Sequence, residues 1–206
     1  MARAVVHPVF TTLWRVELQG TDRIPETSAI VLAANHESVL DGFFLALATR
    51  RQLRFMAKAE LFGYPVLKHL MTALGAFPVL RNADEGRAVA RGVELLEGGE
   101  AIAIFPQGTA IPYRNRPYRR GAARLALAAG APIVPVALIN TEKAMRPYRF
   151  RIGFPRVLIV AGEPIAVARQ APSLEAVAEL TARLEEAIEE LRSPFGPQAH
   201  VWIETQ

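Results

Sequence analysis

The chain has 206 residues, of which 51% are apolar and 21% are charged, and it contains no cysteine. This balance excludes an intrinsically disordered chain, and the lack of cysteine excludes disulfides, thiolate metal sites and thiol nucleophiles. The longest apolar runs, such as 131–139, are too short to span a bilayer, and the N-terminal segment lacks a secretory signal pattern. We therefore expect a cytoplasmic protein.

Short apolar runs alternate with helical patterns along the chain, which is typical of an α/β fold with a largely parallel sheet. Strands are expected at 14–18, 29–34, 54–57, 76–80, 101–105, 133–139 and 157–161. Helices are expected at 42–50, 64–74, 85–97, 120–129 and 174–191, the last within a C-terminal helical region at 173–192. We predict a single domain over 1–206, a sandwich in which helices flank a mixed, largely parallel sheet of about seven strands.

A histidine and an aspartate follow the second expected strand. His36 and Asp41 are five residues apart, between the apolar run 29–34 and a helical pattern. Sites in open α/β sheets favour the carboxyl ends of strands. A histidine that takes a proton from an alcohol needs a partner for its other ring nitrogen, and a carboxylate can supply it. The spacing alone also fits a different arrangement, in which Asp41 caps the helix beside a structural histidine.

Two further strand ends carry polar residues. The run 101–104 is followed by Phe-Pro-Gln-Gly-Thr at 105–109, where a glycine turn lets the backbone approach an anion. The run 76–80 ends on Arg81. A turn without a ligand is the alternative for 105–109, and a single arginine at a strand end carries little information.

Four sequence blocks stand in a fixed order: Asn-His-Glu-Ser-Val-Leu-Asp at 35–41, Gly-Ala-Phe-Pro-Val-Leu-Arg at 75–81, Phe-Pro-Gln-Gly-Thr at 105–109 and Ile-Val-Pro-Val at 133–136. In this order they resemble the glycerolipid acyltransferase family, whose best-known members are the 1-acylglycerol-3-phosphate acyltransferases. The resemblance covers about 14–164 and includes Lys-Ala-Glu-Leu at 58–61 and the basic stretch at 118–123.

The resemblance implies an O-acyltransferase of phospholipid biosynthesis. Its acyl donor would be an acyl thioester, acyl-coenzyme A (acyl-CoA) or acyl carrier protein (acyl-ACP), and its acceptor the free hydroxyl of 1-acyl-sn-glycerol-3-phosphate or a related lysolipid. His36 would be the general base and Asp41 its orienting carboxylate. No metal and no cofactor beyond the acyl donor is implied. The residues expected to hold the acceptor are Lys58, Arg81, Gln107, Gly108, Thr109 and Arg120.

Two positions depart from the family pattern, in which the third block usually reads Phe-Pro-Glu-Gly-Thr-Arg. Gln107 keeps the ability to hydrogen-bond but not the charge, and Ala110 removes a guanidinium that would suit a phosphate. Arg114, Arg116 or Arg120 are candidates to replace it. We hypothesise that the acceptor differs from simple lysophosphatidate.

The charge distribution bears on partners. Residues 1–170 carry a net charge of +9 and residues 171–206 one of −5, and 114–156 holds ten basic residues and one acid. Such a stretch suits an anionic membrane, a phosphorylated ligand or a nucleic acid. A nucleic-acid-binding module lacks any supporting motif, so we expect no nucleic acid partner, and a thioester hydrolase using the same His36 and Asp41 remains an alternative.

Membrane contact is expected to be peripheral, at the inner face of the cell membrane. Apolar and aromatic residues at 5–13 and 61–77 fit an interfacial helix reinforced by basic residues. For 61–77 the alternative is a buried core helix.

Overall fold

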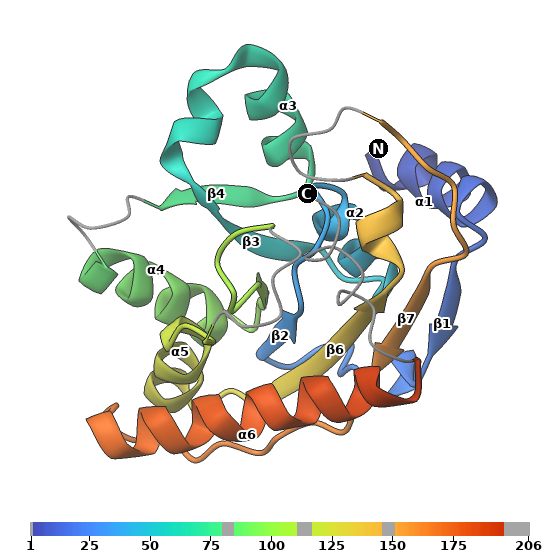
Figure 1. Ribbon diagram of the computed structural model, residues 1–206. Coiled ribbons are helices and arrows are strands. Elements are labelled where there is room, and N and C mark those ends of the chain that lie inside the picture. Colours follow the sequence, from blue (N-terminus) through green and yellow to red (C-terminus); the bar gives the residue numbers. More distant parts are fainter. Residues whose placement is uncertain (1, 80–84, 111–116, 146–150, 196–206) are drawn as a thin grey trace, which may run out of the picture.

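The computed structural model describes residues 2–79, 85–110, 117–145 and 151–195. One sheet of seven strands runs through these residues (Figure 1). Every pair of neighbouring strands is parallel except the pair formed by Ile133–Ile139 and Leu158–Ala161. This arrangement confirms the predicted α/β fold with its mixed, largely parallel sheet. In spatial order the strands are β1 (Glu17–Gln19), β7 (Leu158–Ala161), β6 (Ile133–Ile139), β2 (Ile30–Ala34), β5 (Ala101–Ile104), β3 (Leu53–Lys58) and β4 (Ala76–Val79).

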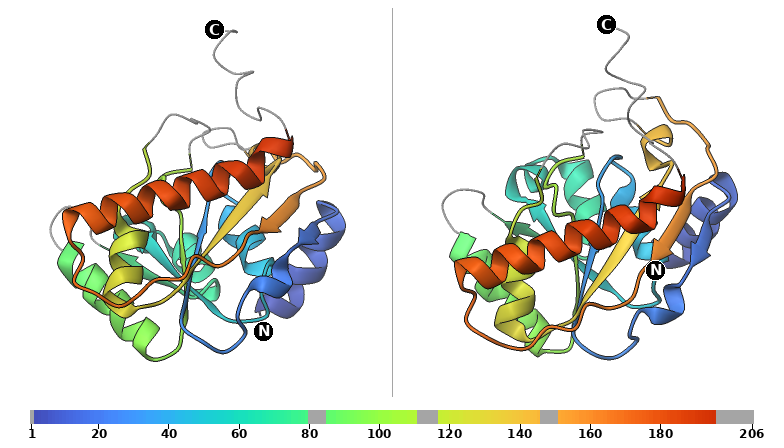
Figure 2. Two further views of the ribbon diagram at one scale, coloured as in Figure 1. Left: turned by 90° about the horizontal axis from the view of Figure 1, so that it is seen from below. Right: turned by 60° about the horizontal axis from the view of Figure 1, so that its bottom comes forward.

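Helices cover the two faces of this sheet. Figure 2 shows α6 crossing one face beside α5 and α4, with α1 on the opposite side. The α-helices are α1 (Ala2–Leu13), α2 (Asp41–Leu47), α3 (Pro65–Ala73), α4 (Glu85–Glu97), α5 (Gly121–Ala129) and α6 (Leu174–Arg192).

The alternation of side chains along β2 explains the two layers. Leu32 points into a cluster that contains Phe44 of α2, whereas its neighbour Val31 points into a second cluster with Leu125 of α5 and Leu184 of α6. Successive side chains of a strand face opposite sides of the sheet, so a central strand covered on both faces must be apolar throughout. All five residues of β2 are buried, which accounts for its uninterrupted apolar sequence.

The N-terminal region differs most from the sequence prediction. The strand predicted at 14–18 begins only at Glu17, because Trp14 and Arg15 form a turn after α1. The indole nitrogen of Trp14 donates to the carbonyl of Gly153 at 2.7 Å, and Arg15 has a φ of +44°. Neither feature has a local sequence signal. The segment 5–13 is helical as part of α1.

Surface helices bear on membrane contact. The described side chains of α3, which are Pro65, Lys68, His69, Met71 and Thr72, are partly or fully exposed. Within the described ranges, no helix combines the length and the apolar character that crossing a bilayer requires.

Candidate active site

The candidate site lies where the parallel strands β2, β5 and β6 end. Because these strands run side by side in the same direction, the residues that follow them meet at one edge of the sheet. His36 follows β2, and the turn 105–109 follows β5. We refer to this edge as the catalytic edge.

His36 and Asp41 are in direct contact at this edge. The ring nitrogen Nδ1 of His36 lies 2.9 Å from Oδ2 of Asp41, whose side chain is fully buried. The same carboxylate oxygen accepts the backbone N–H groups of Glu37 at 2.6 Å and Ser38 at 2.8 Å. Asp41 therefore binds the loop before α2 and does not cap the helix, for which Leu40 is the N-cap residue. An ionised Asp41 requires the proton on Nδ1, which leaves Nε2 to accept a proton from a substrate.

The turn after β5 supports His36 from the other side. Oε1 of Gln107 accepts the backbone N–H of His36 at 2.5 Å, and the Gln107 side chain is buried. The ring of Phe105 stacks on the imidazole with 4.1 Å between centroids. Gln107 thus provides the acceptor that a glutamate would provide at this position, without its charge. The sequence suggested hydrogen bonding by Gln107 but not this partner, which is 71 residues away.

Two polar side chains next to His36 fix the loop to the rest of the fold. Asn35 is fully buried, donates to the carbonyl of Leu138 at 2.9 Å and accepts its N–H at 2.7 Å, as a neighbouring strand would. The hydroxyl of Ser38 donates to the carbonyl of Met145 at 2.8 Å. The loop that carries His36 is therefore hydrogen-bonded on both sides of the histidine.

Gly108 brings a basic side chain to the turn. Its φ of +72° is rarely adopted by other residues, and a Cβ there would lie 2.6 Å from Nε of Arg119. The Arg119 side chain therefore lies against the glycine. The N–H of Gly108 donates to the carbonyl of Phe105 at 2.9 Å, so this amide serves the turn itself. Arg119 was not among the arginines expected to replace the missing one at Ala110.

The other predicted binding residues are placed less completely. Thr109 belongs to the same turn as Gly108, and its hydroxyl donates to the carbonyl of Gly108 at 2.8 Å. Lys58 is the last residue of β3 and so lies at the catalytic edge by its backbone. Arg120 is exposed directly before α5. Arg81 lies outside the described residues, as do Arg114 and Arg116.

A third carboxyl group is buried at this edge. Glu142 follows β6, is 5% exposed, and its carboxylate oxygens have no hydrogen bond within the described part of the chain. The ammonium group of Lys143 is 3.8 Å from Oε1. Burial raises the pKa of Glu142, and the nearby charge of Asp41 acts in the same direction. Among the described residues, no three His, Cys, Asp or Glu side chains gather in a way that would hold a metal ion.

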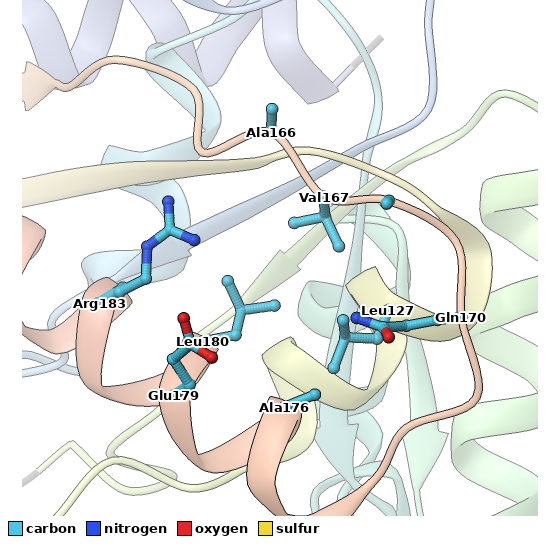
Figure 3. A pocket seen from close by; sticks show the side chains of 9 residues that line it. Leu127, Ala166, Val167, Gln170, Ala176, Glu179, Leu180 and Arg183 are labelled. Carbon is cyan, nitrogen blue, oxygen red and sulfur yellow. The ribbon is translucent and has the colours of Figure 1, made fainter.

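A separate hollow lies on the α6 face of the sheet (Figure 3). Its volume is about 130 Å³, and none of the predicted site residues lines it. The lining residues come from α5, α6 and the segment after β7: Leu127, Ala166, Val167, Ala168, Gln170, Ala176, Glu179, Leu180 and Arg183.

Comparison with known proteins assigns the chain to a family. A model of the Acyltransferase family matches residues 15–139. A 1-acyl-sn-glycerol-3-phosphate acyltransferase of Bacillus subtilis (strain 168) is 30% identical over 181 residues, which are 86% of this chain and 88% of that protein. The chloroplastic 1-acyl-sn-glycerol-3-phosphate acyltransferase BAT2 of Brassica napus is 30% identical over 136 residues, 64% of this chain and 39% of that longer protein.

A solved structure shares the fold. The crystal structure of the 1-acyl-sn-glycerophosphate acyltransferase PlsC from Thermotoga maritima superimposes with a TM-score of 0.74 at 24% sequence identity, covering 95% of this chain and 80% of that one. The family match spans both His36 and the turn 105–109. The chain therefore belongs to the Acyltransferase family and is an acyltransferase.

Proposed function

We propose that the protein transfers an acyl group from acyl-CoA or acyl-ACP to the free hydroxyl of 1-acyl-sn-glycerol-3-phosphate or a related lysolipid, as a step of phospholipid biosynthesis. The contact between Nδ1 of His36 and Oδ2 of Asp41 at the catalytic edge is the observation that carries this proposal. The names of the Bacillus and Thermotoga proteins support this choice of acceptor.

The reaction needs only one general base. Nε2 of His36 takes the proton of the acceptor hydroxyl while the alcohol oxygen attacks the thioester carbonyl carbon. The tetrahedral intermediate collapses, the carbon–sulfur bond breaks, and the thiolate leaves with the proton that His36 returns. The products are the ester and a free thiol, so protons and charge balance without an enzyme nucleophile.

Asp41 stabilises the charged form of the base. When His36 becomes an imidazolium, its Nδ1–H remains directed at a carboxylate that also accepts two backbone N–H groups. Those two donors keep the carboxylate fixed, so it does not reorganise as the charge develops. The stacked ring of Phe105 restricts rotation of the imidazole.

Arg119 and the glycine turn form the proposed phosphate-binding region. A guanidinium group can bind two phosphate oxygens at once. Arg119 lies against Gly108, which directly follows Gln107, the acceptor for the His36 N–H. A phosphate bound there would be held close to the base. The further proposed contacts, carried by the family resemblance, are Lys58, Arg81, Thr109 and Arg120.

Exposed apolar side chains lie on α1, on the loop of His36 and before β7. We call them the apolar rim: Val9, Leu13, Val39, Ile152 and Phe154, each of which is exposed.

 Their exposed fractions run from 43% for Val9 to 53% for Ile152 and Phe154. Large apolar side chains that are exposed together mark a surface that meets another apolar phase.

The apolar rim is continuous with the loop that carries His36. Ser38, next to Val39, binds the carbonyl of Met145, and Met145 pairs with Ile152 as an isolated β-bridge. The ring of Phe154 in turn contacts that of Trp14, with 5.4 Å between centroids. We infer that the apolar rim rests on the inner face of the cell membrane, where the acyl chain of a lysolipid lies and acyl thioesters are accessible.

An acceptor screen with one acyl-CoA donor tests the reaction. Thiol release is measured with lysophosphatidate, a zwitterionic lysolipid, an uncharged lysolipid and no acceptor, with His36→Ala as the blank. We expect release that depends on the acceptor and falls by about 10²–10⁴ in His36→Ala. Release that is independent of any acceptor would instead make the protein a thioester hydrolase, and an exclusive preference for lysophosphatidate would refute the expectation that Gln107 and Ala110 change the acceptor.

Flotation with liposomes tests the membrane proposal. We expect Phe154→Ser to weaken binding to anionic vesicles, whereas Leu174→Ser, at an exposed apolar residue that begins α6, should leave it unchanged. Equal binding by the two variants would contradict a role for the apolar rim.

A further inference from the structure

A buried ion pair joins the loop of His36 to the end of α6. The carboxylate oxygen Oε1 of Glu37 contacts Nη2 of Arg192, and both side chains are 1% exposed. Nη1 of Arg192 also contacts Oε1 of Glu189 at 2.6 Å. Glu37 directly follows the proposed base, whereas Arg192 is the last residue of α6, 155 positions further along the chain.

Apolar packing holds α6 on the sheet independently of this pair. The helix already buries an apolar stripe against the core: Val177, Leu180, Leu184 and Ile188. A buried ion pair loses most of its attraction to desolvation, and replacing it by apolar side chains of similar volume is often neutral or stabilising. Burial alone would lower the pKa of Arg192, yet Glu37 and Glu189 raise it overall, so the guanidinium stays charged. The pair is therefore expected to contribute little to the stability of the fold, and its position beside the loop of His36 indicates a role at the site.

Glu37 is held at both its backbone and its side chain. Its N–H donates to Oδ2 of Asp41, the same oxygen that contacts Nδ1 of His36. Its carboxylate is held by Arg192. If the loop rotated and moved the buried carboxylate of Glu37, it would therefore also move the Glu37 N–H that helps to orient Asp41.

We infer that Glu37 and Arg192 are positioning residues, which use the end of α6 to set the orientation of His36 relative to Asp41. Neither residue needs to touch the substrate for this role. The inference rests on the proposed role of His36 as the base, and it assigns to the C-terminal helix a part in catalysis beyond packing.

The double variant Glu37→Met/Arg192→Met separates positioning from folding. It replaces the buried pair by apolar side chains, so we expect a thermal midpoint close to that of the parent protein. If the pair positions His36, kcat should fall by about 10- to 100-fold while the KM values of donor and acceptor change less than about threefold, since misplacing a catalytic group by ~1 Å costs about 10² in rate. The single variant Glu37→Gln, which keeps the side-chain shape, should show the same split.

The control variant is Leu184→Ala, two turns earlier on the same helix. It should lower the thermal midpoint but leave kcat per folded molecule unchanged when assayed well below that midpoint. A double variant with unchanged kcat would overturn the inference, as would Leu184→Ala and Glu37→Gln losing kcat in equal proportion to their loss of stability. A double variant that fails to fold would overturn it too, because the pair would then be required for the fold. Full activity of His36→Ala would instead refute the proposed function, which is a distinguishable result.

Discussion

Gln107 offers a sharp test of how the site is held together. Its Oε1 is the acceptor for the backbone N–H of His36, and its side chain is buried. Gln107→Leu removes the acceptor and leaves that N–H without its partner. An unsatisfied buried donor costs about 1–3 kcal/mol. Since about 1.36 kcal/mol corresponds to a tenfold change in rate, kcat should fall by between about 5- and 150-fold if the whole cost bears on the geometry of His36.

The assay is steady-state thiol release with acyl-CoA and saturating lysolipid, with Gln107→Glu as the matched variant. A glutamate keeps an oxygen at the same place and, when ionised, accepts a stronger hydrogen bond, so kcat should stay within about threefold of the parent value. An unchanged kcat in Gln107→Leu would refute this reasoning. Equal losses in both variants would also refute it, because the oxygen would not be the group that matters.

Three further predictions follow from contacts near the site. Arg119→Ala should raise the KM for lysophosphatidate about tenfold or more, while the neighbouring Arg120→Ala changes it less, as measured with both variants at saturating donor. Gly108→Ala should lower stability by about 1–2 kcal/mol in denaturant unfolding, because its φ is +72°; no loss would show that the turn adapts. Glu142→Gln should be stabilising at pH 7. Because the folded pKa of Glu142 lies above its unfolded value, the folded state binds more protons between the two, and stability falls as pH rises from about 4.5. The gap in thermal midpoint between the variant and the parent should therefore grow from pH 4 to pH 7, and a constant gap would contradict a buried, hard-to-ionise carboxyl group.

Much of the fold was predictable because its central strands are apolar on both faces and its helices carry regular stripes. The strand 133–139 and the helix 85–97 were predicted with the bounds that the structure has. The turn at Trp14 and Arg15 was not, because a contact with Gly153 and a positive φ at Arg15 leave no periodic pattern. Sequence patterns therefore predict the strands and helices that burial and periodicity determine, but not a turn that a distant contact holds.

The site was predictable only in part, for the same reason. The contact between His36 and Asp41 joins residues five positions apart, and the spacing indicated it. The contact between Gln107 and His36 depends on β2 and β5 lying side by side, which no local pattern reveals.

Arg192 shows how a local rule can mislead. A basic residue in the last turn of a helix ordinarily lies in water and interacts favourably with the helix dipole. Here the helix delivers it to a buried carboxylate. Only the packing of α6 over the sheet distinguishes these two situations.

The single antiparallel pairing in the sheet, between β6 and β7, has a consequence for how the protein can vary. β7 runs back from the catalytic edge, and β1 runs parallel to β7, so the chain enters both strands at that edge. The described residues that lead into these two strands, at 151–157 and at the end of α1, therefore lie on one side of the molecule. They can change length or polarity without altering any crossover helix. Adaptation to a different lipid surface can thus be confined to two segments, while the strands that carry His36 and Gln107 remain as they are.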